Sequence, residues 1–295
     1  MLWGGFRLEF KGSLRTKKLW VILGIMMLLY IPGGFYIQKS GGVEVETVQE
    51  AISTLIGSIN GLGGFFISIL ALLIGATAIN SEIEKGTLRV AMSKPVTRLG
   101  GYIGGKFLAH TVVVALAILL TTLVGGVLGL AWLGAPMNGQ LITDSLLFNG
   151  LLLLAMVQLV ALGYIISTTV KSSSNALGVA LIIFFIVFMT VPAIVQYMAA
   201  KDTLIGDHPP DLEAYQAKYK EYQTKYLFYI PTTQIDVIVS DANRITGEAG
   251  DLRVEYRGIG RAIRENPPVN VGILLGLTLV YLGLAFYRFL RMDLR

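Results

Sequence analysis

The sequence predicts an all-α integral membrane protein with about six transmembrane helices. Hydrophobic residues make up 54% of the 295 residues and charged residues only 15%, whereas about a quarter of an ordinary soluble domain is charged. Several runs of about 20 residues carry no charge, and a helix of that length crosses a bilayer. The chain contains no cysteine, which excludes disulfides, cysteine-bound metals and thiol catalysis.

Residues 1–18 are expected to form an amphipathic elbow helix at the cytoplasmic surface. Apolar Trp3, Phe6 and Leu8 lie among basic residues, and the stretch is too short and too charged to span. Lys106, at the start of a later span, is expected to snorkel to the same headgroups. The predicted membrane-interface residues are Arg7, Lys11, Arg15, Lys17, Lys18 and Lys106.

The predicted spans contain no Asp, Glu, Lys or Arg, which disfavours ion-coupled transport. They are the runs 19–37, 57–80, 107–133, 145–169, 176–199 and 270–287. The first run is a retained span rather than a signal peptide, because it is long and lacks a small-residue end. The glycines in these runs, such as Gly61, Gly63 and Gly64 or Gly125 with Gly129, indicate close helix packing. Their few polar residues, Asn60, Asn149, Gln158, Thr121 and Thr122, fit interhelical hydrogen bonds at least as well as a substrate path.

Basic residues favour cytoplasmic termini in a multi-pass protein of the cell membrane. The short outer loops hold only Lys39, and short cytoplasmic loops are the ones enriched in Lys and Arg. The inner segments hold Arg7, Lys11, Arg15, Lys17, Lys18, Lys85, Arg89, Lys94, Arg98, Lys106, Lys171, Arg288, Arg291 and Arg295. The chain then divides into the elbow over 1–18, five spans over 19–199, an extracytoplasmic helical segment over 200–269, and a sixth span with a cytoplasmic tail over 270–295.

The segment 200–269 contains tyrosines that share one face of a predicted helix. They are Tyr215, Tyr219, Tyr222, Tyr226 and Tyr229, spaced by four and three residues. This stripe fits the core face of a small outer domain best, and a surface for an extracytoplasmic partner or for the membrane interface is the alternative. Pro231 is expected to end this helix, and a short helix is expected from Thr233 to Val239.

Residues 81–106 form a charged island between two apolar runs. Gly86 is expected to break the arriving helix, and Thr87 to cap a short turn over Leu88–Ser93 that Pro95 stops. Such a short helix with basic flanks at a membrane face favours docking over catalysis. Gly100–Phe107 superficially fits a phosphate loop, but Phe107 stands where Ser or Thr should bind magnesium. His110 and His208 have no metal-ligand spacing, so a satisfied or interfacial histidine is expected.

The charged island resembles the signature of type-2 ABC transporter permeases. The matching residues run from Glu84 to Leu88, from Met92 to Arg98, and over Gly105 and Lys106, and 166–176 is similar to that family's second cytoplasmic turn. The elbow and six-span layout also agree across the chain. The departures are the long segment 200–269 and Ala91, where the family commonly has Leu.

The resemblance implies a permease of an ATP-driven exporter with no ATPase of its own. Two separate ATP-binding subunits would bind ATP and magnesium, and a second permease copy or paralogue would complete the transporter. The turn over Leu88–Ser93 would be the coupling helix that docks on the ATPase. The docking residues so implied are Glu82, Glu84, Gly86, Thr87, Leu88, Arg89, Met92, Ser93, Pro95, Arg98 and Lys171.

Other functions remain open from the sequence. A membrane scaffold could recruit an extracytoplasmic partner through the tyrosine stripe without any transport. An energy-independent carrier or channel is disfavoured by the scarcity of polar residues in the spans. Membrane lipid is an expected partner in each case, and nucleic acid in none.

Overall fold

The computed structural model describes residues 2–15, 20, 21, 23, 24, 47–88, 99–203, 212–246, 253–265 and 271–291. The predicted first span, 19–37, therefore lies almost wholly outside the described residues. Within the described part, five helices are long and apolar enough to cross a membrane. They are Val48–Glu84, Gly100–Leu123, Gly139–Thr169, Ser173–Thr203 and Ile273–Leu290. The all-α membrane architecture is confirmed, and the count of six spans stays a prediction.

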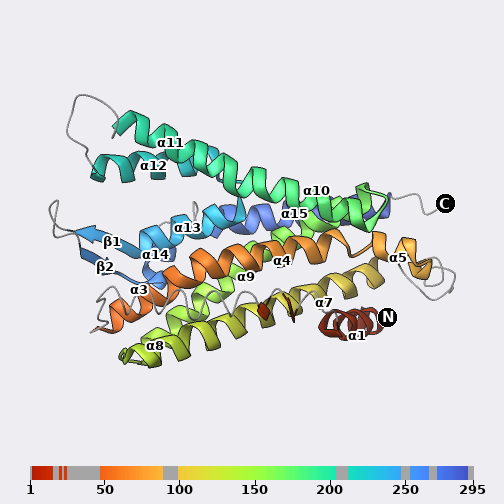
Figure 1. The fold of residues 1–295 in the computed structure, drawn as a ribbon, viewed down its shortest axis with the longest axis horizontal. Coiled ribbons are helices and arrows are strands. Elements are labelled where there is room, and N and C mark those ends of the chain that lie inside the picture. The colour runs from red at the N-terminus through yellow and green to blue at the C-terminus, as the bar shows by residue number, and fades with distance from the viewer. Residues whose placement is uncertain are drawn as a thin grey trace.

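Figure 1 shows long helices running side by side, with α1 crossing them nearly end-on. The helices are α1 (Leu2–Arg15), α3 (Val48–Ser58), α4 (Gly64–Ala76), α5 (Asn80–Glu84), α7 (Leu99–Leu120), α8 (Leu128–Leu133), α9 (Gly139–Thr169), α10 (Ser173–Phe185), α11 (Val191–Thr203), α12 (Leu212–Tyr226), α13 (Pro231–Ala242), α14 (Ile259–Glu265) and α15 (Ile273–Leu290). The π-helical turns are η1 (Ile59–Gly63), η2 (Thr121–Val127) and η3 (Ile186–Thr190), and the strands are β1 (Asn243–Thr246) and β2 (Arg253–Tyr256).

The helix that holds the second predicted span starts nine residues earlier than the uncharged run. Thr47 and Glu50 form a capping box, in which the Thr47 hydroxyl accepts from the Glu50 amide and the Glu50 carboxylate accepts from the Thr47 amide. A capping box satisfies two amides that a helix start leaves free. The charged first turn of α3 is therefore helical although it lies outside the apolar run.

Helix α9 is central to the buried core. It packs against α4, α7 and α15, and its buried side chains include Phe148, Met156 and Tyr164. In contrast, the faces of α10, α11 and α15 that point away from the bundle carry exposed apolar side chains such as Ile182, Phe185 and Leu279. Exposed apolar surface of this extent fits contact with lipid tails.

Helices α4 and α9 approach each other closely at Gly75 and Gly163, two glycines that were not predicted to pack closely. A Cβ atom on Gly75 would lie 2.4 Å from the Val160 carbonyl oxygen, and one on Gly163 would lie 2.6 Å from the Leu72 carbonyl oxygen. Only glycine permits this approach, because backbone atoms cannot move aside as a side chain can. Gly61, predicted to pack closely, has open space at its Cβ position.

The segment before the last span contains helices and a small hairpin. Strands β1 and β2 pair antiparallel, with Asn243 opposite Tyr256, and this hairpin was not predicted. The prediction that Pro231 ends a helix is wrong. Helix α12 already ends at Tyr226, and Pro231 is the first residue of α13, where its missing N–H costs nothing.

The turn between α12 and α13 lies alongside a candidate span rather than beyond its end. Leu227 and Ile230 are fully buried against Val195 of α11, and Phe188 in η3 packs on the same cluster. Figure 1 shows α12 running beside α11. Part of the segment 200–269 therefore packs at the level of the apolar helix Ser173–Thr203. Its extracytoplasmic location stays a prediction.

Candidate coupling site

The predicted break at Gly86 is confirmed. Gly86 has a φ of 68°, in the left-handed region that favours glycine, and it lies two residues after the end of α5. The Thr87 hydroxyl donates to the Glu82 carbonyl oxygen at 3.3 Å, and Leu88 is buried. Residues 89–98 lie outside the described chain, and with them Arg89, Met92, Ser93, Pro95, Arg98 and the amides that Thr87 was predicted to cap.

Helix α5 is attached through its backbone to α9. The amides of Ile79 and Asn80 donate to the Ser167 hydroxyl at 2.9 and 3.1 Å. Asn80 is completely buried, and its side-chain amide donates to the Ser172 carbonyl oxygen at 3.4 Å. One serine on α9 thus satisfies two amides that the first turn of α5 leaves free.

The C-terminal end of α5 is attached to the start of α10. The Glu84 carboxylate accepts from the Ser173 amide at 2.8 Å and from the Ser173 hydroxyl at 2.5 Å. A carboxylate is favoured at this place, because helix N-termini carry free amides and a partial positive charge. Lys171 is exposed in the same turn, two residues before Ser173. The two predicted cytoplasmic turns therefore meet at Glu84.

The prediction that Lys106 snorkels to headgroups is wrong. The side chain is 1% exposed, and its ammonium lies 3.1 Å from Glu9 Oε2 and 2.6 Å from Glu82 Oε1. It also donates to the Ala78 carbonyl oxygen at 2.9 Å. Two carboxylates and a carbonyl at the end of α4 offer this cation better partners than headgroups do, so it points into the protein.

A chain of hydrogen bonds extends this site to α9. His110 contacts Glu9 Oε1 through Nε2 at 2.9 Å and the Tyr164 hydroxyl through Nδ1 at 2.9 Å. Tyr102 donates to the Glu82 carboxylate at 2.9 Å. Burial alone would raise the pKa of Glu9, but the hydrogen bond with His110 and the charge of Lys106 outweigh it and lower that pKa to about 2. As predicted, His110 is a satisfied histidine. The set Glu9, Glu82, Tyr102, Lys106, His110 and Tyr164 is called the ion cluster below.

Helix α1 lies against α7 through a small residue. A Cβ atom on Gly5 would lie 3.1 Å from the Tyr102 carbonyl oxygen, and Figure 1 shows α1 at the same end of the bundle as α5. Trp3 and Leu8 are 68% and 75% exposed. Arg7, Lys11 and Arg15 are exposed too, whereas Lys17 and Lys18 lie outside the described residues. Contact of these residues with headgroups stays a prediction.

The tyrosine stripe divides into two parts. Tyr215 stacks on Tyr219, whose hydroxyl accepts from Gln196 of α11, and Tyr222 donates to Asp202 at 2.6 Å. Tyr226 and Tyr229 are exposed, and Tyr229 lies in the turn after α12. Tyr226 and Tyr229 also make ring contacts, with Tyr222 and Phe228, so all five tyrosines have partners within the chain. A partner surface over the whole stripe stays a prediction.

Four of the five polar residues named in the predicted spans make hydrogen bonds between helices, whereas the Thr121 hydroxyl donates to the Ala117 carbonyl oxygen of its own helix. Thr122 donates to Asn149 at 3.0 Å, and Asn60 donates to Asp236 of α13 at 2.6 Å. The Gln158 amide donates to the Leu274 carbonyl oxygen and to Thr278.

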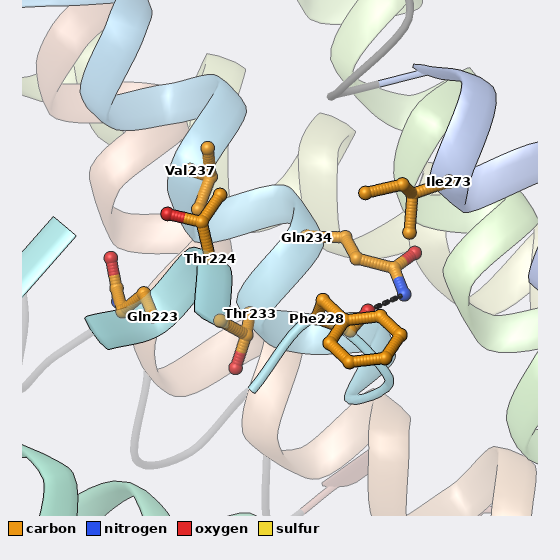
Figure 2. A pocket seen from close by; sticks show the side chains of 7 residues that line it. All are labelled: Gln223, Thr224, Phe228, Thr233, Gln234, Val237 and Ile273. Carbon is orange, nitrogen blue, oxygen red and sulfur yellow. Dashed lines mark hydrogen bonds between the residues drawn. The ribbon is translucent and has the colours of Figure 1, made fainter. Parts of the chain in front are cut away.

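A pocket lies next to Gln158, which contacts Gln234 in the pocket lining. Figure 2 shows that the Gln234 amide donates to the Phe228 carbonyl oxygen there. Its lining is Gln223, Thr224, Phe228, Thr233, Gln234, Val237 and Ile273.

Sequence reasoning missed Glu9, Ser167 and Ser173 as parts of the site. Glu9 is the only acidic residue within 1–18, which is the one signal that could have indicated an internal partner. Ser167 and Ser173 flank Lys171 in the turn that was predicted, but no pattern relates them to α5. Among the described residues, no group of three or more His, Asp or Glu side chains could hold a metal ion.

Comparison with known proteins points to one family. A family model described as "ABC-2 family transporter protein" matches residues 6–294. The chain is 29% identical over 194 residues to the probable ABC transporter permease protein NosY of Pseudomonas aeruginosa, and 28% identical over 195 residues to the protein of that name from Stutzerimonas stutzeri. Each match covers 63% of this chain and 66% of the relative. The chain thus spans just under two thirds of the length of these relatives.

Proposed function

Because the chain belongs to the ABC-2 family of transporter proteins, we propose that it is the membrane-spanning permease subunit of an ATP-driven exporter. Its relatives carry the printed name of probable ABC transporter permeases. The proposal adds the direction of transport, the docking of an ATPase, and dimerisation.

In this proposal, the energy for transport comes from other chains. Two ATP-binding subunits bind ATP and magnesium and hydrolyse the ATP, while this chain has no catalytic role. A second copy of the chain, or a paralogue, forms the other half of the membrane pathway. Residues 81–106 dock on the ATPase and face the cytoplasm, as do both termini.

The observation that carries the proposal is the anchoring of α5, immediately before residues 89–98. Helix α5 is joined to α9 through Ser167, to α10 through Ser173, and to α7 through Lys106. A docking segment must be fixed to the spans if movement of the ATP-binding subunits is to move the spans. Charge supports the orientation. Lys171 lies in the turn before α10 and Arg288 in the last turn of α15, and both places are expected at the cytoplasmic face.

The test is co-expression with a candidate ATP-binding subunit in membranes. We expect the two proteins to copurify, and ATP hydrolysis to be stimulated when the permease is present. Gly86→Pro should reduce this stimulation at least about tenfold, because proline fixes φ near −65° and cannot adopt the turn. Charge reversal at Arg89 or Arg98 should have the same effect.

The matched control is Lys201→Met, an exposed lysine at the other end of the molecule. Full stimulation in the Gly86, Arg89 and Arg98 variants would contradict docking through 81–106. Failure of the wild-type chain to capture any ATP-binding subunit would contradict the proposed function itself.

A further inference from the structure

We propose that Lys106 is a positioning residue that joins α1, α5 and α7 into one body, so that the first cytoplasmic loop cannot shift without carrying the N-terminal helix with it. The mechanical linkage stands on this chain alone. Only its use in transport rests on the proposed function.

The ammonium group of Lys106 has no donor left over. It carries three N–H donors, and its three partners are Glu9 of α1, Glu82 of α5 and the Ala78 carbonyl at the end of α4. Each partner comes from a different helix or turn, and Lys106 itself lies on α7. Four segments of the chain therefore meet at one nitrogen atom.

Burial makes the arrangement specific. A lysine that is 1% exposed must keep its partners, because an unpaired charge inside a protein is very costly. Removing the lysine also affects both carboxylates, since Glu9 and Glu82 would lose the cation between them and Glu9 would keep only His110. The cluster thus has one favourable arrangement, in which α1 and α5 are both held.

Glu9 is the only ionic contact of α1 with the described spans, and it has two partners there. Its Oε2 binds Lys106 and its Oε1 binds His110, both on α7. His110 continues to Tyr164 on α9. Otherwise α1 contributes a close backbone approach at Gly5 and partly buried Phe10 and Leu14. The ion cluster is therefore what fixes the position of α1 along α7.

The same cluster fixes α5 on the other side. Glu82 binds Lys106 at 2.6 Å and accepts from Tyr102 at 2.9 Å, so two residues of α7 hold it. Because the Thr87 hydroxyl donates to the Glu82 carbonyl oxygen, a displacement of the chain after Gly86 reaches Glu82. Lys106 then transmits the displacement to Glu9.

The linkage is tested by hydrogen exchange on the full chain in lipid nanodiscs, without any ATPase. In Lys106→Met, we expect the exchange of amides in both α1 and residues 78–88 to rise about tenfold or more. Glu9→Gln leaves the bond between Lys106 and Glu82 intact, so it should loosen α1 more than residues 78–88. Amides of α13 and the hairpin should not change in either variant, which separates a local linkage from general destabilisation.

Lys106→Arg and Lys201→Met complete the design. Arginine keeps the charge, so it should restore protection of α1 and residues 78–88 relative to Lys106→Met, while Lys201→Met should match wild type. Two results in Lys106→Met would overturn the linkage. One is an equal rise in amide exchange in α13 and the hairpin, and the other is a rise in only one of α1 and residues 78–88. If Lys106→Met does not fold, Glu9→Gln decides the inference. Amide exchange in α1 that stays at the wild-type rate in this variant would overturn the linkage.

The role in transport is tested separately with a captured ATP-binding subunit. Glu9→Gln should bind that subunit as wild type does, yet its stimulation of ATP hydrolysis should fall about fivefold or more. Normal stimulation in this variant would overturn the role in transport. If the wild-type chain captures no ATP-binding subunit, the proposed function fails, and the exchange measurements still decide the linkage.

Discussion

Glu9 and Asp236 are two partly buried carboxylates in different regions of the molecule, and their neighbours differ. Glu9, beside the docking segment, contacts Lys106 and His110, which lower its pKa to about 2. Asp236, on α13, accepts from the Asn60 amide, and among the described residues no lysine or arginine pairs with it. Burial raises the pKa of Asp236 to about 6, and the Asn60 hydrogen bond opposes the rise only in part. The same chemical group therefore has opposite effects on stability in the two regions.

The difference indicates what each region is built to do. Ion pairs in a dry site favour one geometry strongly, because moving either partner exposes an unpaired charge. A hydrogen bond between an amide and a carboxyl group survives protonation, since a neutral carboxyl can still bond to Asn60. The contacts of Glu9 therefore depend on charge, whereas the contact between Asp236 and Asn60 does not.

Replacing Lys106 should have the largest effect. Lys106→Met removes the cation between Glu9 and Glu82, leaves Glu9 with His110 alone, and should lower the free energy of unfolding by about 3–5 kcal/mol. Chemical unfolding in detergent micelles at neutral pH measures this change. A loss of unfolding free energy no greater than that of Lys201→Met would contradict the comparison, because the ion cluster would then contribute nothing to stability.

The next effect is the loss of stability in acid that Glu9 causes. Its pKa is lower in the folded chain than its ordinary value of 4.5, so it stabilises the fold above that value. The contribution, on the order of 3 kcal/mol, is lost as the pH falls from about 4.5 toward 2. Stability curves for wild type and Glu9→Gln should therefore differ in slope over this window. Parallel curves would show that Glu9 is not ion-paired.

Asp236 should give a smaller effect of opposite sign. Its pKa is higher in the folded chain than the ordinary 3.8, so ionisation works against folding and stability falls as the pH rises from about 4 to 6. Asp236→Asn should raise the free energy of unfolding by about 2 kcal/mol at pH 7.5 and leave it unchanged near pH 4. An equal gain at both pH values would mean that burial of the charge is not the cause.

The smallest effect is expected from Ser173→Ala, which weakens the contact of a third, exposed carboxylate. Glu84 keeps the Ser173 amide as a partner and gains access to water, so exposed contacts of this kind cost little to break. Differential scanning fluorimetry compares the unfolding temperature of Ser173→Ala with that of Ser174→Ala, in which the neighbouring exposed serine is replaced. A loss as large as that of Lys106→Met would show that the attachment of α5 to α10 matters as much as the ion cluster.

The membrane class and the break at Gly86 could be predicted because each depends on local composition. Long uncharged runs leave few alternatives to spanning helices, and a glycine after a charged helix permits a left-handed turn. The capping box of Thr47 and Glu50 was equally readable. It lies outside the uncharged run, so the composition of that run alone does not indicate where the helix starts.

The ion cluster could not be predicted, because its members lie far apart in the sequence. Lys106 looked like an interfacial lysine from its position at the start of an apolar run, and only the packing of α1 across α7 places Glu9 next to it. The hairpin was missed for a different reason. Its strands are four residues each, too short for an alternating pattern to stand out.

The contact between Gly75 and Gly163 has a consequence for motion. A Cβ atom on either glycine would overlap backbone atoms of the other helix, so α4 and α9 are already at their closest approach. The crossing therefore works as a fulcrum. One helix can tilt about it, but the two helices cannot move closer together there. On one side of the crossing, α3, η1 and α4 run from Val48 to Gly75, a length of about 40 Å at about 1.5 Å per residue. A small tilt at the crossing therefore moves the start of α3 several times as far as it moves residues one turn away from Gly75.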